Sequence, residues 1–486
     1  MSIFSSSVKS QIIDPVFHSN TRCEFRLANR GESYMPTMRI GNLGLSCSGF
    51  DNTYHFGPGA LSCVSRIQLL DGNEPIDTLR NVGNWLTFKN SLKSNSQNDN
   101  VFNNLVGGSL GWATGATGEL LSNNNKLIRQ SGGAETLGTL DLRDVFPYLN
   151  SVSHLSTKLF KNLRVVIEYH TASIALANGQ GTDTLTKTVP ILIVDEIIDE
   201  ALAASLDKQF QSATWTAIEH DQVGVPAVPG IPVAPAVGDV ALSQSQSVSL
   251  RVNGFQNKAV GRVMISKVYQ DLQNYIYGVP QGAFTGGVKA LGQYGSKALH
   301  KEEFNMRING RNVLAGRGAD SPASMAMLCA DTWGELNTVP GSITESLGLD
   351  TKYDLTDATL LPNTLIGRPP RNWVGAPRTV PRILTAGGNL DAAGTAWTAG
   401  EEPTAEQGIW IGNSAWIGIG VHDRVSDMQI QLTRVGNPTS VRTPAVPGTD
   451  QPTASAGNEK ALDLHIFAEV QKSIQVSNGS YKIFYA

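Results

Sequence analysis

The chain has 486 residues, of which 41% are hydrophobic and only 16% are charged, and its formal net charge is −4. This composition excludes a disordered chain, and the lack of a Lys/Arg run argues against a body that wraps nucleic acid. The charged fraction is below the ~25% typical of soluble domains. It fits a protein that buries much of its surface against copies of itself, and equally an ordinary β-protein rich in Ser, Thr and Asn.

The N-terminal stretch "MSIFSSSVKSQIIDPVF" lacks the basic start and apolar run of a signal peptide. No window holds ~18 consecutive apolar residues, so we expect no transmembrane segment. The four cysteines show neither CxxC spacing nor a paired framework and are predicted to be reduced thiols: Cys23, Cys47, Cys63 and Cys329.

Alternating apolar and polar residues predict strands in the first half of the chain. Residues 21–29 and 162–171 each place their apolar side chains on one face, as half-buried strands do. Residues 188–198 are instead almost continuously apolar, which predicts a strand covered on both faces.

Helical patterns are few. Residues 79–92 space Leu79, Val82 and Leu86 at i, i+3 and i+7, and residues 153–163 form a second short candidate. The segment "DEIIDEALAASLDKQF" near residue 200 predicts a short helical joint between the two halves.

The second half shows the same period of two. Asn-Gly pairs, the strongest short hairpin signal, end or join several of these segments. The predicted strands lie within residues 213–221, 247–254, 304–310, 427–434 and 462–485.

These patterns predict an all-β fold with few short helices and long loops. The absence of βαβ alternation argues against doubly wound and TIM-type enzymes. Each half holds about the number of strands that an eight-stranded jelly roll needs. We therefore predict an N-terminal arm (1–20) and two consecutive eight-stranded jelly rolls, over 21–200 and 201–486.

The sequence offers no recognisable catalytic, cofactor-binding or metal-binding residues. It lacks a P-loop, an HExxH motif, a His/Cys cluster and a GxSxG elbow. Trp410 and Trp416 are the only candidates for a sugar-binding aromatic platform, and packing is their more ordinary use. We expect no enzyme activity and no cofactor.

Prolines recur every third residue at Pro226, Pro229, Pro232 and Pro235, the repeat of a polyproline II helix. A related "PAVPG" segment contains Pro444 and Pro447. Both segments fall between predicted strands, within loops at 223–240 and 436–459. Because proline fixes φ and lowers the entropy of holding a loop extended, we predict intersubunit or surface loops.

The chain resembles the double jelly-roll major capsid proteins of the polinton-like virus and virophage lineage. The resemblance lies in the order of its elements, which covers most of the chain. The segments that carry it are "CEFRLAN", "SRIQLLDGNEPIDTLRNVGNWL", "LDLRDVFPYLNSVSHLSTKLFKNLRVVIEYH", "FNMRINGRNVLAG", "VHDRVSDMQIQLTR" and "AEVQKSIQVSNGSYKIFYA".

The resemblance implies a major capsid protein. It implies that three chains form a pseudo-hexagonal capsomer, and that such capsomers tile an icosahedral shell around a double-stranded DNA genome. The implied partners are the chain itself, neighbouring capsomers, a single jelly-roll penton protein and minor cementing proteins, with no specific nucleic-acid site. The implied location is the virion, after synthesis without secretion in the host cytoplasm or nucleus.

Two other interpretations remain open at the level of sequence. A fibre or adhesin is expected to show a repetitive shaft or an export signal, and neither is present in the sequence. A carbohydrate-active β-sandwich enzyme needs two carboxylates across a cleft, and the sequence does not place such a pair.

Overall fold

The structure of the chain is a computed structural model. It describes residues 7–29, 33–47, 52–54, 59–86, 129–130, 138–171, 176–178, 185–226, 245–269, 278–279, 289–290, 302–316, 318–319, 328, 331–333, 416–435, 461–477 and 479–485.

The first half forms two main antiparallel sheets. One has the order β11 (Gly138–Asp141), β5 (Arg39–Leu43), β16 (Ile191–Ile197), β4 (Ser33–Tyr34) and β12 (Leu155–Ser156), with β1 (Val8–Ile13) on the other edge of β16. The other has the order β2 (Phe17–His18), β3 (Arg22–Arg26), β13 (Leu163–Tyr169), β8 (Val64–Asp71) and β9 (Glu74–Arg80). Smaller sheets join β10 (Arg129–Gln130), β7 (Asn52–Tyr54) and β14 (Leu176–Asn178), and β15 (Leu185–Lys187) with β6 (Leu45–Cys47).

The strand order of the first half is that of a jelly roll. Its eight main strands in chain order are β1, β3, β5, β8, β9, β11, β13 and β16. Numbered one to eight, they give the order 1-8-3-6 in one sheet and 2-7-4-5 in the other. This interleaving is produced by two nested Greek keys.

The second half repeats this order. One sheet runs β17 (Ser212–Val225), β26 (Leu462–Ser477), β19 (Lys258–Tyr269) and β24 (Trp416–Val425). The other runs β18 (Ser245–Arg251), β25 (Met428–Val435), β22 (Glu302–Ile308) and β23 (Arg311–Asn312). β27 (Ser480–Tyr485) extends the first of these sheets by pairing with β26, and β20 (Gly278–Val279) pairs with β21 (Lys289–Ala290). Numbered in chain order, the sheets again read 1-8-3-6 and 2-7-4-5, so the predicted double jelly roll is confirmed.

The two Asn-Gly turns form as predicted. Asn309 and Gly310 have φ values of 50° and 82° between the partners Ile308 and Arg311. Positive φ at both central residues is typical of a type I′ turn, whose twist matches the flanking strands. At the C-terminal hairpin, Gly479 has φ 72° where β26 turns into β27.

The predicted helical joint is confirmed as α6 (Glu200–Gln209). Its N-cap is Asp199, whose carboxylate accepts from the amides of Ala201 and Leu202 at 2.9 and 3.1 Å. This cap satisfies two of the amides that a helix start leaves unpaired. The other short helices are η1 (Gly59–Cys63), residues 82–86, η2 (Leu142–Asp144) and α4 (Tyr148–Ser151).

Two local predictions are wrong. Residues 153–163 are not helical. Leu155 and Ser156 pair with β4, and the side chain of Phe160, in the turn that follows, is buried in the core. β16 is also not fully covered on both faces. Leu192 and Val194 are buried, but Ile193 on the outer face lies opposite Ile12, which is 67% exposed.

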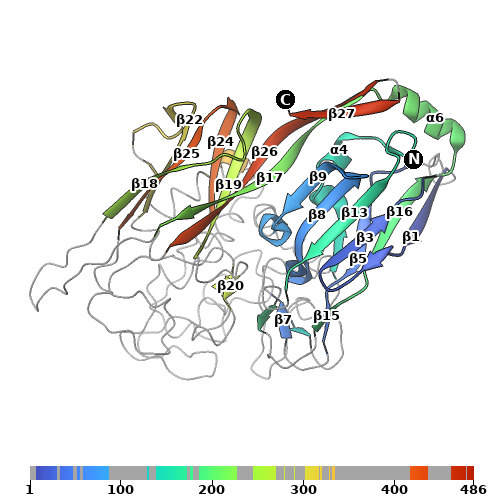
Figure 1. Cartoon of the computed structure of the whole chain (residues 1–486), viewed down its shortest axis with the longest axis horizontal. Helices are drawn as coiled ribbons and strands as arrows, with labels where there is room; N and C mark the ends of the chain where they lie inside the picture. The colour runs from blue at the N-terminus through green and yellow to red at the C-terminus, as the bar shows by residue number, and fades with distance from the viewer. Residues whose placement is uncertain are drawn as a thin grey trace, which may run out of the picture.

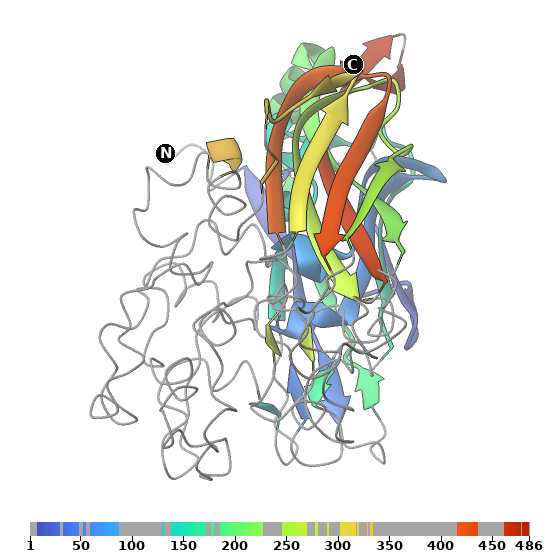
Figure 2. The ribbon, with the colours of Figure 1, turned by 90° about the vertical axis from the view of Figure 1, so that its left-hand side faces the viewer.

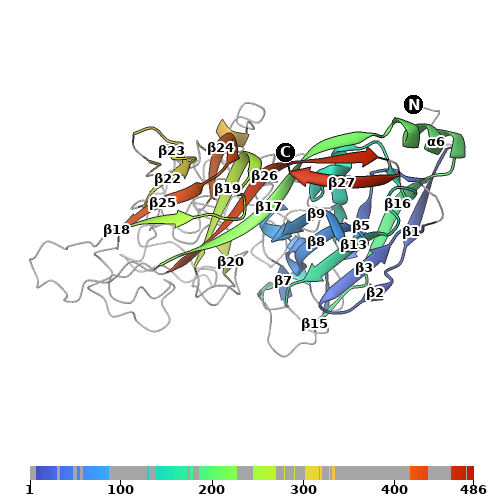
Figure 3. The ribbon, with the colours of Figure 1, turned by 45° about the horizontal axis from the view of Figure 1, so that its top comes forward.

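Figure 1 shows the two jelly rolls side by side, with β17 and β26 running between them. Seen from the side, the strands of the second jelly roll stand upright in front of those of the first (Figure 2). Figure 3 shows β27 lying over the first jelly roll. No helix in the described part of the chain is long and apolar enough to span a bilayer.

Candidate functional site: the junction between the two jelly rolls

The long strands β17 and β26 contribute to both hydrophobic cores. They pair over their whole shared length, from Ser212 opposite Gln475 to Val225 opposite Leu462. Trp215, near one end, and Phe467, near the middle of the pair, pack into the core of the first jelly roll. Near the other end, Val225 and neighbouring residues pack into the core of the second. The halves are therefore joined by shared apolar packing as well as by the chain.

Aromatic side chains from the two halves meet at this junction. Phe467 stacks on Trp85 with ring centroids 6.0 Å apart, and Trp215 meets Tyr148 edge-on at 4.9 Å. Such pairs contribute about 0.5–1.5 kcal/mol each beyond the area they bury. The hydroxyl of Tyr481 also donates a 2.9 Å hydrogen bond to Asp71 of β8.

A charge network lies beside these aromatic contacts and joins Glu219 of β17 to Lys472 of β26 and Lys258 of β19. Glu219 accepts from Lys258 at 2.6 Å and lies 3.2 Å from the ammonium of Lys472. The ring of Tyr485 lies over both ammonium groups, at 4.6 and 5.1 Å. The charged pairs are largely shielded from water, because the Glu219 and Lys472 side chains are only 16% and 11% exposed.

Asp77 is the buried acid next to this network. It accepts from the Tyr148 amide at 3.2 Å and is 1% exposed. Burial raises the pKa of Asp77 to about 7, although the nearby Lys472 acts in the opposite direction. Near neutral pH this carboxyl is therefore divided between its protonated and ionised forms.

Two histidines and an asparagine meet beside the aromatic contact. Nε2 of His220 lies 3.1 Å from Nδ1 of His465, and the rings stack with centroids 5.4 Å apart. Nδ2 of Asn81 lies 3.0 Å from the His220 nitrogen and 3.2 Å from the His465 nitrogen. Burial lowers the pKa of His220 to about 3 and that of His465 to about 4, so both rings are neutral at pH 7.

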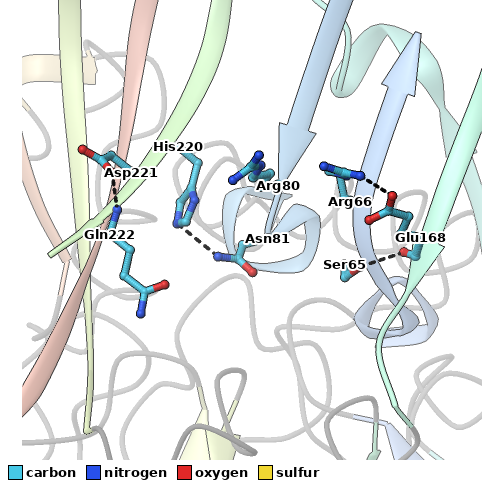
Figure 4. A pocket seen from close by; sticks show the side chains of 8 residues that line it. All are labelled: Ser65, Arg66, Arg80, Asn81, Glu168, His220, Asp221 and Gln222. Atoms are coloured by element: carbon cyan, nitrogen blue, oxygen red, sulfur yellow. Dashed lines mark hydrogen bonds and ion pairs between the residues drawn. The ribbon is translucent and has the colours of Figure 1, made fainter. Parts of the chain in front are cut away.

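A cavity of about 380 Å³ opens at this point between the two jelly rolls. Figure 4 shows side chains of both halves around it, and the His220 ring directed toward Asn81. The lining is polar throughout, unlike the mainly apolar pockets that bind organic ligands. The lining residues are Ser65, Arg66, Arg80, Asn81, Glu168, His220, Asp221 and Gln222.

The proline loops stay a prediction, and only one of their named prolines lies in the described residues. Pro226 is exposed and directly follows β17. Pro229, Pro232, Pro235, Pro444 and Pro447 lie outside the described residues, as does Trp410. Of the cysteines, Cys23 and Cys63 are buried free thiols, as predicted.

Sequence reasoning did not find the junction residues. His220 and His465 are 245 positions apart, and nothing in their local sequence connects them. They meet because β17 and β26 pair in a register that sets Gln222 opposite His465 and His220 opposite Phe467. Within the described residues, no three His, Cys, Asp or Glu side chains gather in a metal-binding arrangement.

No protein-family model and no curated protein matches the chain. Among solved structures, a chain of the Sputnik virophage determined by cryo-EM gives a TM-score of 0.50 at 10% identity, over 98% of this chain and 88% of that chain. The mavirus major capsid protein gives 0.49 at 8% identity, over 99% and 90%. The Faustovirus major capsid protein gives 0.43 at 10% identity, over 97% and 90%. Over 98% of its length, the chain therefore shares the fold of this Sputnik virophage chain, and its own strand order identifies that fold as a double jelly roll.

Proposed function

We propose that the chain is a viral major capsid protein that forms homotrimers, and that these pseudo-hexagonal capsomers tile an icosahedral shell around a double-stranded DNA genome. The observation that carries the proposal is the repeated strand order, 1-8-3-6 and 2-7-4-5, in two jelly rolls that stand side by side. Three such chains around a threefold axis present six similar barrels, which is the shape that a hexagonal lattice requires.

The junction supports this role because a tile must keep its shape. The shared packing of Trp215 and Phe467 fixes the two barrels relative to each other. The buried pairing of Glu219 with Lys258 and Lys472 adds directional contacts at the same place. Weak contacts between rigid capsomers, repeated over a lattice, give a strong shell through multivalency.

The surface also supports assembly with other chains. Ile12, Val16, Phe17 and Val189 are each more than half exposed, on or beside β1, β2 and β16. Exposed apolar side chains concentrated at one edge are a feature of surfaces that proteins bury on association.

On the basis of the fold, the proposal also covers the partners of the chain and its location. We assign the chain to the virion, with a penton protein and cementing proteins as further partners, and to a structural rather than an enzymatic role. The division near residue 200 between a first jelly roll and a second (201–486) belongs to the same proposal. The predicted arm (1–20) is corrected, because β1 (Val8–Ile13) and β2 (Phe17–His18) pair within the two sheets of the first jelly roll. So does the assignment of Pro226, Pro229, Pro232, Pro235, Pro444 and Pro447 to intersubunit or surface loops.

Light scattering after size exclusion tests the oligomer. The 52.0 kDa chain is expected to elute as a particle of about 156 kDa, the mass of a trimer. Negative-stain images should show hexagonal outlines for single capsomers and flat hexagonal arrays at high concentration. A stable monomer over a wide range of concentrations would contradict the proposal.

A further inference from the structure

The contacts among Asn81, His220 and His465 do not form a satisfied hydrogen-bond network. Their three atoms lie 3.0, 3.1 and 3.2 Å apart, so each pair is at hydrogen-bond distance. A ring nitrogen holds either a proton or a lone pair, never both. If the Asn81 amide donates to both rings, the two ring nitrogens face each other with a lone pair on each. If one ring donates to the other, it cannot also accept from the amide.

Turning the Asn81 amide over does not remove the conflict. Its oxygen and nitrogen exchange places by rotation, so either atom can face the two rings. With the oxygen inward, two donating rings bring two protons together, and a single donating ring leaves a lone pair opposite the oxygen. Every assignment of protons therefore leaves one of the three close contacts without a hydrogen bond.

A metal ion removes the conflict, because all three atoms then direct lone pairs toward it. Zn²⁺ binds imidazole nitrogens and oxygen ligands at roughly 2.0–2.2 Å. An ion at that distance from three atoms that are themselves 3.0–3.2 Å apart lies about 1 Å out of their plane, which leaves its opposite side open to a further ligand.

The surroundings have mixed charge. Arg80 lies close enough to His220 to disfavour a positive charge there, whereas Asp463 favours one at His465. The polar cavity between the jelly rolls reaches Asn81 and His220, which gives an ion a route from solvent and leaves room for a water ligand.

We propose that Oδ1 of Asn81, Nε2 of His220 and Nδ1 of His465 bind one divalent transition-metal ion, with Zn²⁺ as the reference ion. Asn81 follows β9 of the first jelly roll, and the two histidines belong to β17 and β26 of the second. The bound ion would link the two halves at their junction. This proposal stands independently of the capsid role.

The test uses the full chain, stripped of metal with a chelator and then titrated with Zn²⁺ by calorimetry. The unmodified chain should bind one more ion per chain than His465→Gln, and Zn²⁺ should raise its Tm but not that of the variant. His422→Ala is the matched control, because His422 is exposed and lies away from the site on β24. It should bind Zn²⁺ as the unmodified chain does.

A second variant provides an independent test if His465→Gln folds poorly. Asn81→Asp replaces the amide by a carboxylate of the same size and should tighten Zn²⁺ binding roughly tenfold or more. Circular dichroism and size exclusion establish that each variant is folded. Equal Zn²⁺ binding by the unmodified chain and His465→Gln would overturn the proposal, as would binding to Asn81→Asp that is no tighter.

Discussion

Phe467 provides the most direct test of how the two jelly rolls depend on each other. Its backbone belongs to β26 of the second jelly roll, but its fully buried ring packs in the core of the first, against Trp85. A second ring, that of His220, lies 4.8 Å away. Phe467→Ala removes these contacts and leaves a cavity that the neighbouring rings cannot readily fill.

The expected cost follows from this environment. Replacing a buried phenylalanine by alanine costs about 3–5 kcal/mol of unfolding free energy. With the contact with Trp85 also lost, we expect a cost near the middle of that range, about 4 kcal/mol. Since each 1.4 kcal/mol is tenfold in an equilibrium constant, amides that exchange through opening of the junction should exchange roughly a thousandfold faster.

Hydrogen exchange read by mass spectrometry measures this effect strand by strand. The strand to follow is β13, which lies in the first jelly roll and far from Phe467 in sequence. Phe304→Ala is the matched control, because Phe304 is 1% exposed but packs only in the core of the second jelly roll. It should accelerate exchange in β25 and affect β13 less than Phe467→Ala does. Unchanged exchange of β13 in Phe467→Ala would refute the shared core.

Three further predictions concern single groups. Burial raises the pKa of Asp77 to about 7, so the native state holds its proton more tightly than the unfolded chain does. The unfolding free energy should therefore fall by about 4 kcal/mol as pH rises from about 4 to about 7. In urea unfolding, Asp77→Asn should lack this pH dependence, and an unchanged pH dependence would count against the reasoning. Glu219→Gln leaves Lys258 and Lys472 without their counter-charge and should cost about 3 kcal/mol, measured by the same method; a cost within error of zero would show that the network contributes nothing. Asp199→Ala removes the N-cap of α6 and should cost about 1 kcal/mol, whereas Asp199→Asn should retain most of the stability, and equal loss in both would argue against capping.

The sequence predicts much of the fold because strand formation leaves a local pattern. In residues 21–29, Cys23, Phe25 and Leu27 alternate with polar residues, and all three are buried. The Asn-Gly pairs locate two hairpin turns for the same reason, since their backbone preference is local. The helical joint predicted near residue 200 forms at Glu200–Gln209, where the structure adds the Asp199 cap.

Local pattern fails where tertiary contacts override it. Residues 153–163 have helical spacing, but pairing of Leu155 with β4 and burial of Phe160 favour a short strand and a turn. The apolar run at 188–198 predicts full coverage, but β1 covers only the edge of β16, and Ile193 shares its outer face with Ile12.

The sequence by itself determined the all-β class, the positions of most described strands and the two-part organisation, because each depends on residues close together along the chain. Only the tertiary structure decided the strand order, the sharing of Phe467 and Trp215 between the halves, and the meeting of Asn81 with His220 and His465. These features depend on the register between β17 and β26, whose paired residues are about 240 to 260 positions apart. A register of that kind is set by which apolar faces fit together in the folded chain, and no local period records it.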